Sequence, residues 1–258
     1  MTTAEITEMP MAAKSGITPA EWQARVDLAA CYRIVAHYGM TDMLNNHISV
    51  RVPDEPGRFL INPFGLFYEE VTASNLVKVD IEGNIIGNAE YGINPAGFVI
   101  HAAVHRGRHD LACVIHTHTR AGVAVSAQRR GLLPISQHAL RFYNRIAYHD
   151  FEGLALDLDE QQRLIADLGS HKVMLLRNHG ILAGGASVRE AFEMLYYLEM
   201  ACKIQIDILS GGQEPIYPSP EVCERTASQW DRSEEVLQGR DWPAIMRLLD
   251  RKDSSFRS

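Results

Sequence analysis

Three histidines stand where two predicted strands end, and the imidazole ring is a common ligand of transition metals. His116 and His118 lie two residues apart, at the end of an apolar run that begins at Leu111. Alternate side chains of a strand point to the same face, so these two rings can converge. His179 follows a second apolar run, residues 173–176, and would join them if the two strands were neighbours. The sequence therefore predicts a three-histidine site for a divalent ion, with an open position typical of a catalytic metal.

Two further histidines, His101 and His105, lie four residues apart on a predicted helix and share one of its faces. This spacing can support a metal pair, but the glutamate of an HExxH motif is absent between them. His101 is therefore a candidate for lining a pocket, and His105 is a weaker one.

The elements that must carry these side chains follow from capping residues and from hydrophobic periodicity. A helix is predicted from Thr18 to His37, where Thr18 and Glu21 would form a capping box. The alternation of apolar and polar residues over 48–52 indicates a strand with one buried face. Short apolar runs extend this strand into an antiparallel meander, at residues 59–61, 76–79 and 85–86.

The rest of the chain alternates helices with short buried strands. Helices are predicted at 96–105 and 121–128, strands at 111–115 and 173–176, and a long helix from Ser187 to Leu209. Gly184-Gly185 lies outside any phosphate-binding motif and is interpreted as a turn before that helix. We expect a layered α/β protein with three parts, a flexible arm at residues 1–17, one domain at residues 18–212 and a helical tail at residues 213–258.

Composition excludes several classes of protein. The chain has 258 residues and a net charge of −7, and its one short basic cluster is Arg129-Arg130, so a nucleic-acid partner is not expected. The four cysteines have no paired spacing, which argues against a disulfide framework and favours a cytoplasmic location. No stretch is typical of a signal peptide or of a membrane span.

Six segments together resemble the class II aldolase/adducin family: NHISVR at 46–51, LINPFGL at 60–66, NPAGF at 94–98, VIHTH at 114–118, GLLPI at 131–135 and LRNHG at 176–180. The resemblance runs from about Thr18 to Gly212. It implies a three-layered α/β/α fold with a central, largely antiparallel sheet. It also implies that His116, His118 and His179 bind one catalytic divalent ion, for which zinc is the first choice and manganese and iron are alternatives.

The resemblance departs from the sugar-phosphate aldolases of the family at two places. Those enzymes carry a glutamate acid/base four residues before the histidine that matches His101, where this chain has Gly97. They also carry a serine pair for the substrate phosphate, where this chain has Pro95 and Ala96. Both departures match the adducin-like branch of the family and argue against a sugar-phosphate aldolase.

The resemblance also suggests groups that would act around the metal. Two candidate catalytic residues are His101 and His138, and His138 matches a tyrosine acid that the aldolases present from a neighbouring subunit. His47 would bind a carboxylate when protonated, although a histidine without a role is the alternative for both His47 and His138. The full set of candidate substrate-binding residues is His47, Ser49, Asn62, Gly65 and Gly97.

Three classes of function remain open. The first is a metal-dependent carbon–carbon lyase, of decarboxylase or retro-aldol type, for a small hydroxy or oxo acid that can be aromatic. The second is a mononuclear non-haem iron oxygenase of aromatic hydroxy or oxo acids. The third is a non-catalytic, adducin-like interaction domain, against which the three retained histidines weigh. The expected partners are a small carboxylate substrate and further copies of the chain in a homotetramer with interfacial active sites, without nucleic acid or membrane.

Overall fold

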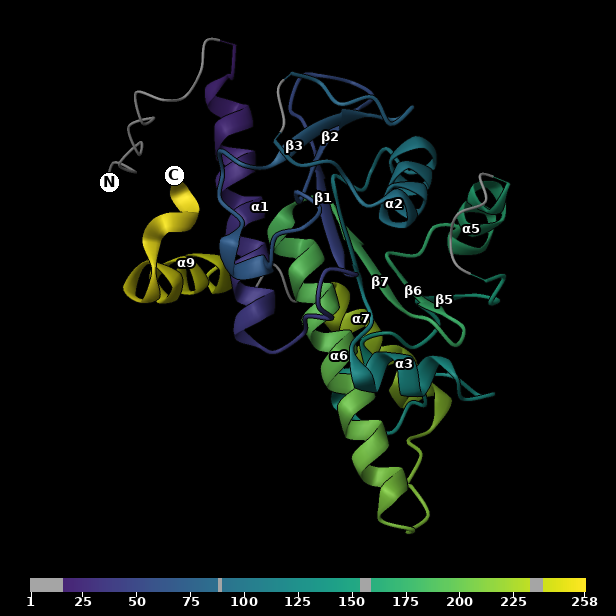
Figure 1. Cartoon of the computed structure of the whole chain (residues 1–258). Coiled ribbons are helices and arrows are strands. Elements are labelled where there is room, and N and C mark those ends of the chain that lie inside the picture. Colours follow the sequence, from purple (N-terminus) through teal and green to yellow (C-terminus); the bar gives the residue numbers. More distant parts are fainter. Residues whose placement is uncertain (1–15, 88–89, 154–158, 233–238) are drawn as a thin grey trace.

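A computed structural model of the chain describes residues 16–87, 90–153, 159–232 and 239–258 (Figure 1). The predicted N-terminal arm lies outside the described residues, apart from Gly16 and Ile17. The helices, 3-10 helices (η) and strands are, in order, α1 (Pro19–His37), β1 (His47–Arg51), β2 (Arg58–Ile61), η1 (Tyr68–Glu70), β3 (Val77–Asp80), α2 (Pro95–Gly107), β4 (Cys113–Thr117), α3 (Arg120–Ser126), α4 (Gln137–Leu140), β5 (Ile146–His149), α5 (Glu160–Leu168), β6 (Val173–Leu176), β7 (Gly180–Gly185), α6 (Val188–Ser210), α7 (Pro220–Asp231), α9 (Asp241–Lys252) and η2 (Ser254–Arg257).

The seven strands in the described part of the chain form one sheet in the order β3-β2-β1-β4-β7-β6-β5. The pair β5–β6 is parallel, and each other neighbouring pair is antiparallel, so the prediction of a largely antiparallel sheet is confirmed. The meander β1-β2-β3 is confirmed as well. Its predicted last strand is reduced to a single bridge between Ile85 and Val79.

Alternate residues of the central strands face two separate layers of helices. Ile115 of β4 packs in a core with side chains of α1 and α6. Its neighbour Val114 points to the other face and packs, with Leu182 of β7, against side chains of α2 and α5. Figure 1 shows α1 and α6 on one side of the sheet and α2 and α5 on the other. The predicted three-layered α/β/α architecture is therefore confirmed.

Helix α1 begins where the sequence predicts, although its capping box forms only in part. The Thr18 hydroxyl accepts a hydrogen bond from the amide of Glu21 at 3.1 Å. The Glu21 carboxylate is fully buried and pairs instead with Arg25 at 2.9 Å and with Lys78 of β3 at 2.7 Å. A buried carboxylate needs such partners, because its desolvation is costly. The network therefore ties α1 to the edge of the sheet.

The strand that carries the first two histidines lies later than predicted, at residues 113–117 instead of 111–115. The prediction for Gly184-Gly185 was wrong, because both glycines lie inside β7 and pair with β4. A Cβ atom at Gly185 would lie 2.5 Å from the backbone nitrogen of Ala191 in α6. Gly185 therefore marks the close approach of a helix to the sheet, and local turn statistics cannot distinguish such a glycine from one in a turn.

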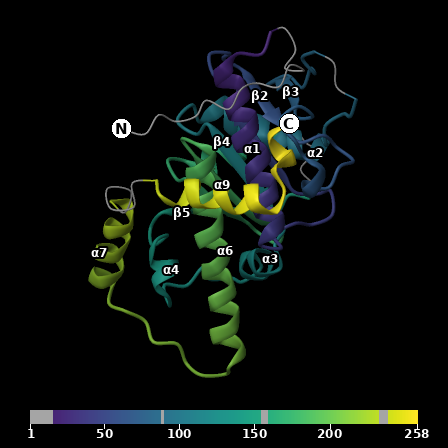
Figure 2. The same cartoon turned by 90° about the vertical axis from the view of Figure 1, so that its left-hand side faces the viewer.

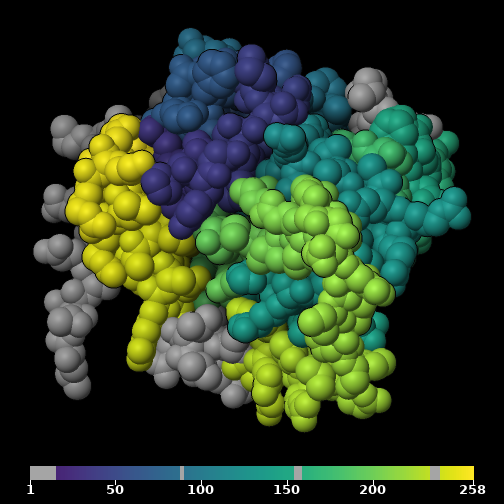
Figure 3. All heavy atoms as spheres, turned by 90° about the horizontal axis from the view of Figure 1, so that it is seen from below, coloured from purple at the N-terminus to yellow at the C-terminus, as the bar shows by residue number. Residues whose placement is uncertain are grey.

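The C-terminal tail is helical in its described part, and its last segment covers the chain's own helix α1. Phe256 is fully buried, and its carbonyl accepts a hydrogen bond from the amide of Ala73 at 2.9 Å. Arg33 of α1 pairs with Asp253 at 3.0 Å. Figure 3 shows this segment, in yellow, lying against the N-terminal part of the molecule. Among the described residues, no helix combines the length and the apolar character needed to cross a membrane.

Replacement of Phe256 by alanine is expected to destabilise the protein by about 3–5 kcal/mol, because a fully buried aromatic side chain is lost and a cavity remains. Urea unfolding followed by circular dichroism measures this change. The variant Arg251→Ala, altered at an exposed position of α9, is the control. If Phe256→Ala unfolds at the same urea concentration as the control, the tail does not contribute to the core.

Candidate metal centre

The three predicted ligands come from one strand end and one hairpin. His116 lies inside β4, and His118 follows its last residue. The strand next to β4 is β7, not the predicted strand 173–176, and His179 lies in the turn between β6 and β7. In this turn the amide of His179 donates to the carbonyl of Leu176 at 3.1 Å, and Asn178 has a φ of 57°. The turn therefore brings His179 to the end of β4.

The Nε2 atoms of the three rings lie close together. The distances are 2.9 Å between His116 and His118, 3.2 Å between His116 and His179, and 3.0 Å between His118 and His179. Within the described part of the chain these three residues form a potential metal-binding group. Tetrahedral ligands at zinc–nitrogen distances of about 2.0–2.1 Å are separated by about 3.3 Å, so the spacing is slightly contracted but fits one ion.

Hydrogen bonds at the opposite ring nitrogens orient two of the ligands. The Nδ1 of His116 is 3.0 Å from the carbonyl oxygen of Ile181, and the Nδ1 of His118 is 3.0 Å from a carboxylate oxygen of Asp42. Both partners are acceptors, so each Nδ1 must carry the proton. Each Nε2 then presents a lone pair toward the other, which is unfavourable without a cation between them. Outer partners of this kind are typical of metal-bound histidines.

Sequence reasoning missed these outer residues. Asn46 is fully buried, accepts a hydrogen bond from the amide of His118 at 2.9 Å and donates to the carbonyl of Met40 at 2.9 Å. It opens the NHISVR segment, which was the available signal for its role. Asp42 lies in a polar loop without any pattern, so the sequence offers no signal for it.

Replacement of Asp42 by alanine is expected to weaken zinc binding by about 10–100-fold, because the His118 ring loses the acceptor that fixes its orientation. Competition with a chromophoric chelator measures the dissociation constant. Asp207→Ala, which removes an exposed carboxylate of α6, is the matched control for net charge. Equal affinities for the two variants would contradict an orienting role for Asp42.

His47 lies beside the triad and opposite Gly97. It faces His116 across the β1–β4 pair, with ring centroids 5.9 Å apart and planes at 22°. A Cβ atom at Gly97 would lie 2.4 Å from Cδ2 of His47, so this glycine leaves the space that the ring fills. Neither ring nitrogen has a hydrogen-bond partner among the described residues.

The electrostatics of His47 correct its predicted role. Burial lowers the pKa of this ring to about 3, with further lowering by His118 and His179. His47 is therefore neutral near pH 7 and does not offer the positive charge that we predicted for binding a carboxylate. Burial and the neighbouring rings also lower the pKa of His116, and the pKa of His179 falls to about 4. The neutral form of histidine is the one that binds metals.

Ser49, His101 and His105 form a buried chain behind His47. The Ser49 hydroxyl lies 2.5 Å from Nδ1 of His101 and 2.7 Å from Nε2 of His105. All three residues are almost fully buried, with at most 1% of the surface of each exposed. The predicted contact of Ser49 and His101 with substrate is therefore not supported. The His101 ring instead packs edge to face against the His47 ring, with centroids 5.8 Å apart. These buried residues therefore help to fix the position of the His47 ring.

Burial of neutral histidines predicts a loss of stability in acid. The pKa of His105 is lowered to about 3 by burial and by Arg51, whereas an unfolded histidine has a pKa near 6.5. The unfolded chain therefore binds more protons as the pH falls below 6.5, and stability is lost progressively down to about pH 3. At pH 5 this amounts to about 2 kcal/mol for His105 alone. Urea unfolding between pH 7 and pH 5 should show a smaller loss for His105→Gln than for the wild type.

Asn62 and Gly65 lie where β2 ends, on the same edge of the sheet as the triad. Asn62 is 4% exposed, and its side-chain oxygen accepts a hydrogen bond from the Tyr32 hydroxyl at 2.9 Å. It therefore shapes the loop, whereas Gly65 is exposed in this loop with a φ of 112°. The amide of Phe64 donates to the carbonyl of Gly92 at 2.9 Å, which joins this loop to the segment before α2.

His138, the predicted proton donor, lies elsewhere in the same chain. It is on α4, where its ring packs against Tyr197 of α6 with centroids 5.7 Å apart. Figure 2 shows α4 and α3, the helix that follows His118, on opposite sides of α6. Within one chain, the helix that carries His138 and the helix that follows His118 are therefore separated by α6.

With this geometry established, comparison with known proteins assigns the family. The sequence profile of the class II aldolase and adducin N-terminal domain matches residues 26–206. The chain therefore belongs to the class II aldolase/adducin family. Alpha-adducin of Rattus norvegicus is 46% identical over 194 residues, which are 74% of this chain but 26% of that protein. The likeness to adducin thus covers one part of a much longer protein.

Solved structures of the family show the same fold. An aldolase II superfamily protein from Pseudomonas syringae has 52% sequence identity and a TM-score of 0.89, and the match covers 94% of this chain and 98% of that chain. L-fuculose 1-phosphate aldolase from Glaciozyma antarctica has 25% identity and a TM-score of 0.81, with 98% of each chain covered. The class II aldolase fold is therefore common to a named enzyme and to this chain.

Proposed function

We propose that the protein is a divalent-metal-dependent lyase that breaks a carbon–carbon bond of a small hydroxy or oxo acid. The observation that carries the proposal is the convergence of three Nε2 atoms at an accessible place, where 21% of the His118 side chain is exposed. Three histidine ligands leave further coordination positions for substrate oxygens. A divalent ion, with zinc as our first choice, would polarise the bound acid and stabilise the negative charge that develops as the bond breaks.

The residues beside the triad favour a lyase that does not use the glutamate acid/base of the sugar-phosphate aldolases. Gly97 offers no acid or base, and the His47 ring fills the space next to it. A neutral imidazole still carries one N–H, and neither ring nitrogen of the buried His47 has a hydrogen-bond partner among the described residues. Decarboxylation and retro-aldol cleavage both require that a proton reach the carbanion at the end of the reaction. We assign this delivery to His138 of a neighbouring copy.

The assignment of His138 requires an oligomer. One ligand of the triad, His118, is partly exposed in a single chain, and α4, the helix that carries His138, lies on the other side of α6 from α3. A homotetramer with interfacial active sites would bring His138 of another copy to the triad. We place the protein in the cytoplasm, because all four cysteines are free and buried.

The test combines metal analysis with a substrate screen. Protein purified without added metal is analysed for zinc, manganese and iron, then assayed with aliphatic and aromatic 2-hydroxy and 2-oxo acids. Release of carbon dioxide or of an aldehyde and uptake of oxygen are followed in parallel. The expected result is about one metal ion per chain and product release without oxygen use. His118→Ala, with an altered ligand, is the negative control.

Each other outcome selects against this proposal. Iron-dependent oxygen uptake would show an oxygenase instead. A full complement of metal without turnover of any acid in the panel would contradict the substrate class. The absence of bound metal from the wild-type protein, even after anaerobic addition of zinc, manganese or iron, would favour the non-catalytic, adducin-like reading.

A further inference from the structure

A buried arginine links the long helix α6 to the C-terminal helix α7. The Arg141 guanidinium lies 4.7 Å from the ring centroid of Tyr197 in α6 and 4.9 Å from that of Trp230 in α7. Its Nη1 donates to the Glu193 carboxylate at 2.9 Å, and only 7% of Arg141 is exposed. The two rings also contact each other, with centroids 4.9 Å apart and planes at 57°, so the guanidinium lies over a pair of adjoining rings. It is attracted by both rings, and the attraction grows when water is excluded. We call these four residues the arginine clamp.

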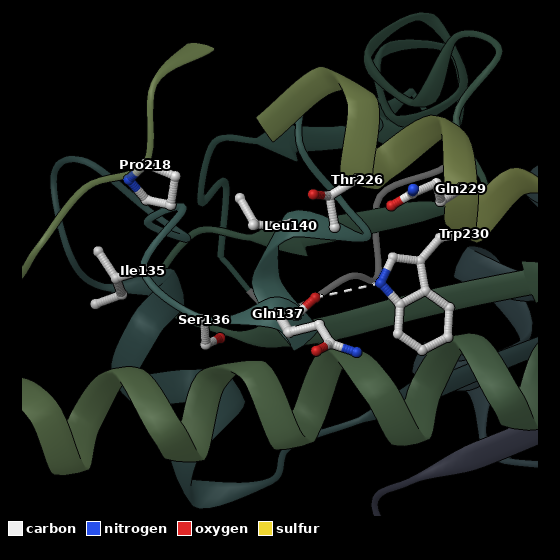
Figure 4. Close-up of a pocket in the computed structure, with 8 residues that line it drawn as sticks. All are labelled: Ile135, Ser136, Gln137, Leu140, Pro218, Thr226, Gln229 and Trp230. Carbon is white, nitrogen blue, oxygen red and sulfur yellow. Dashed lines mark hydrogen bonds between the residues drawn. The ribbon is translucent and has the colours of Figure 1, made fainter. Parts of the chain in front are cut away.

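The arginine clamp lies directly beside His138. The His138 ring packs against Tyr197, the same ring that contacts Arg141. Trp230 also reaches the first residue of α4, because its indole N–H donates to the carbonyl of Gln137 at 3.3 Å (Figure 4). Trp230 therefore contacts residues on both sides of His138 in the sequence. These are Gln137, which precedes it, and Arg141, three residues after it.

Helix α4 needs such support because it has four residues and cannot hold its own conformation. On the side toward α7 it borders a pocket of about 560 Å³. Figure 4 shows that Trp230 closes one end of this pocket, next to Gln137. The residues that line it are Ile135, Ser136, Gln137, Leu140, Pro218, Thr226, Gln229 and Trp230. On this side, α4 is therefore held by individual contacts, such as the one from Trp230, and not by a closely packed hydrophobic core.

We propose that Trp230 is a positioning residue, which fixes the orientation of His138 through Gln137, Arg141 and Tyr197. The proposal rests on the function proposed above, in which His138 delivers a proton to substrate. It gives a functional task to α7, a helix that begins beyond residues 26–206, which the family profile matches. Loss of the clamp would leave α4 free to change its conformation, and His138 would then sample orientations that cannot deliver a proton.

The test compares Trp230→Ala and Trp230→Phe with a matched control in the full-length protein. Phenylalanine keeps an aromatic face for Arg141 but cannot donate to Gln137. Trp242→Phe is the control, because Trp242 lies in α9 and donates to Asp27 at 3.1 Å, away from the clamp. The first readout is the nuclear magnetic resonance signal of the His138 ring in protein labelled at histidine, assigned with His138→Gln. Near-ultraviolet circular dichroism verifies that each variant is folded.

We expect Trp230→Ala to shift and broaden the His138 signal and to lower kcat by about 10-fold with little change in KM, because a proton-transfer group loses its orientation. Trp230→Phe should give an intermediate result, and Trp242→Phe should leave both quantities unchanged. An unchanged His138 signal in folded Trp230→Ala would overturn the clamp, whether or not the wild type has lyase activity. A shifted signal with unchanged kcat, in a protein that does turn over substrate, would overturn the catalytic role of the clamp.

Discussion

Replacement of His116 by alanine is expected to abolish stoichiometric metal binding and to lower metal-dependent turnover by at least about 1,000-fold, because one of three ligands is lost. We expect the largest effect at His116, since it is fully buried whereas His118 and His179 are partly exposed. Elemental analysis after extensive dialysis and titration with zinc measure the loss directly.

The control for this prediction must separate ligand loss from unfolding. His116 also bonds the carbonyl of Ile181, so its removal costs stability by about 1–3 kcal/mol. His179→Ala is the second variant, because His179 is partly exposed and no backbone bond of its ring is broken. If folded His179→Ala and His116→Ala both keep one tightly bound ion per chain, the triad is not the metal site.

The part of the site that the sequence predicts most directly is the pair of histidines on one strand. His116 and His118 are adjacent along one strand, so the two-residue period of a strand is enough to place their rings together. The position of His179 depends instead on the hairpin β6–β7, and periodicity cannot show that β7 is inserted between β4 and β6. The three rings therefore converge as predicted, although the two predicted strands are not neighbours and β7 lies between them.

The sequence predicted which residues lie near the site better than it predicted their burial and protonation. Ser49 was predicted to bind substrate and His101 to act in catalysis. Both are fully buried behind His47, where they do not face a substrate. The neutral state of His47 follows from desolvation, which depends on how deeply α2 covers the strand. Contacts between residues far apart in sequence, such as Trp230 with Gln137, have no local signature at all.

Gly97 gives the second large prediction, because two effects of opposite sign compete there. Alanine within a helix is favoured over glycine by up to about 1 kcal/mol. The added Cβ atom would, however, lie 2.4–2.6 Å from three atoms of the buried His47 ring, and such overpacking costs about 1–3 kcal/mol or more. The ring cannot move away freely, since His101 and His116 pack against it. We therefore expect Gly97→Ala to be destabilising.

A double-mutant cycle in urea tests this prediction. His47→Ala removes the ring, so Gly97→Ala made in that background should be neutral or stabilising, which corresponds to a coupling energy of about 1–3 kcal/mol. Gly92→Ala is the control, because an added Cβ there meets nothing within 4 Å. If Gly97→Ala is as stable as the wild type in both backgrounds, His47 does not fill the space in front of position 97. In that case, Gly97 would leave an open space beside the three histidines rather than one closed by an imidazole.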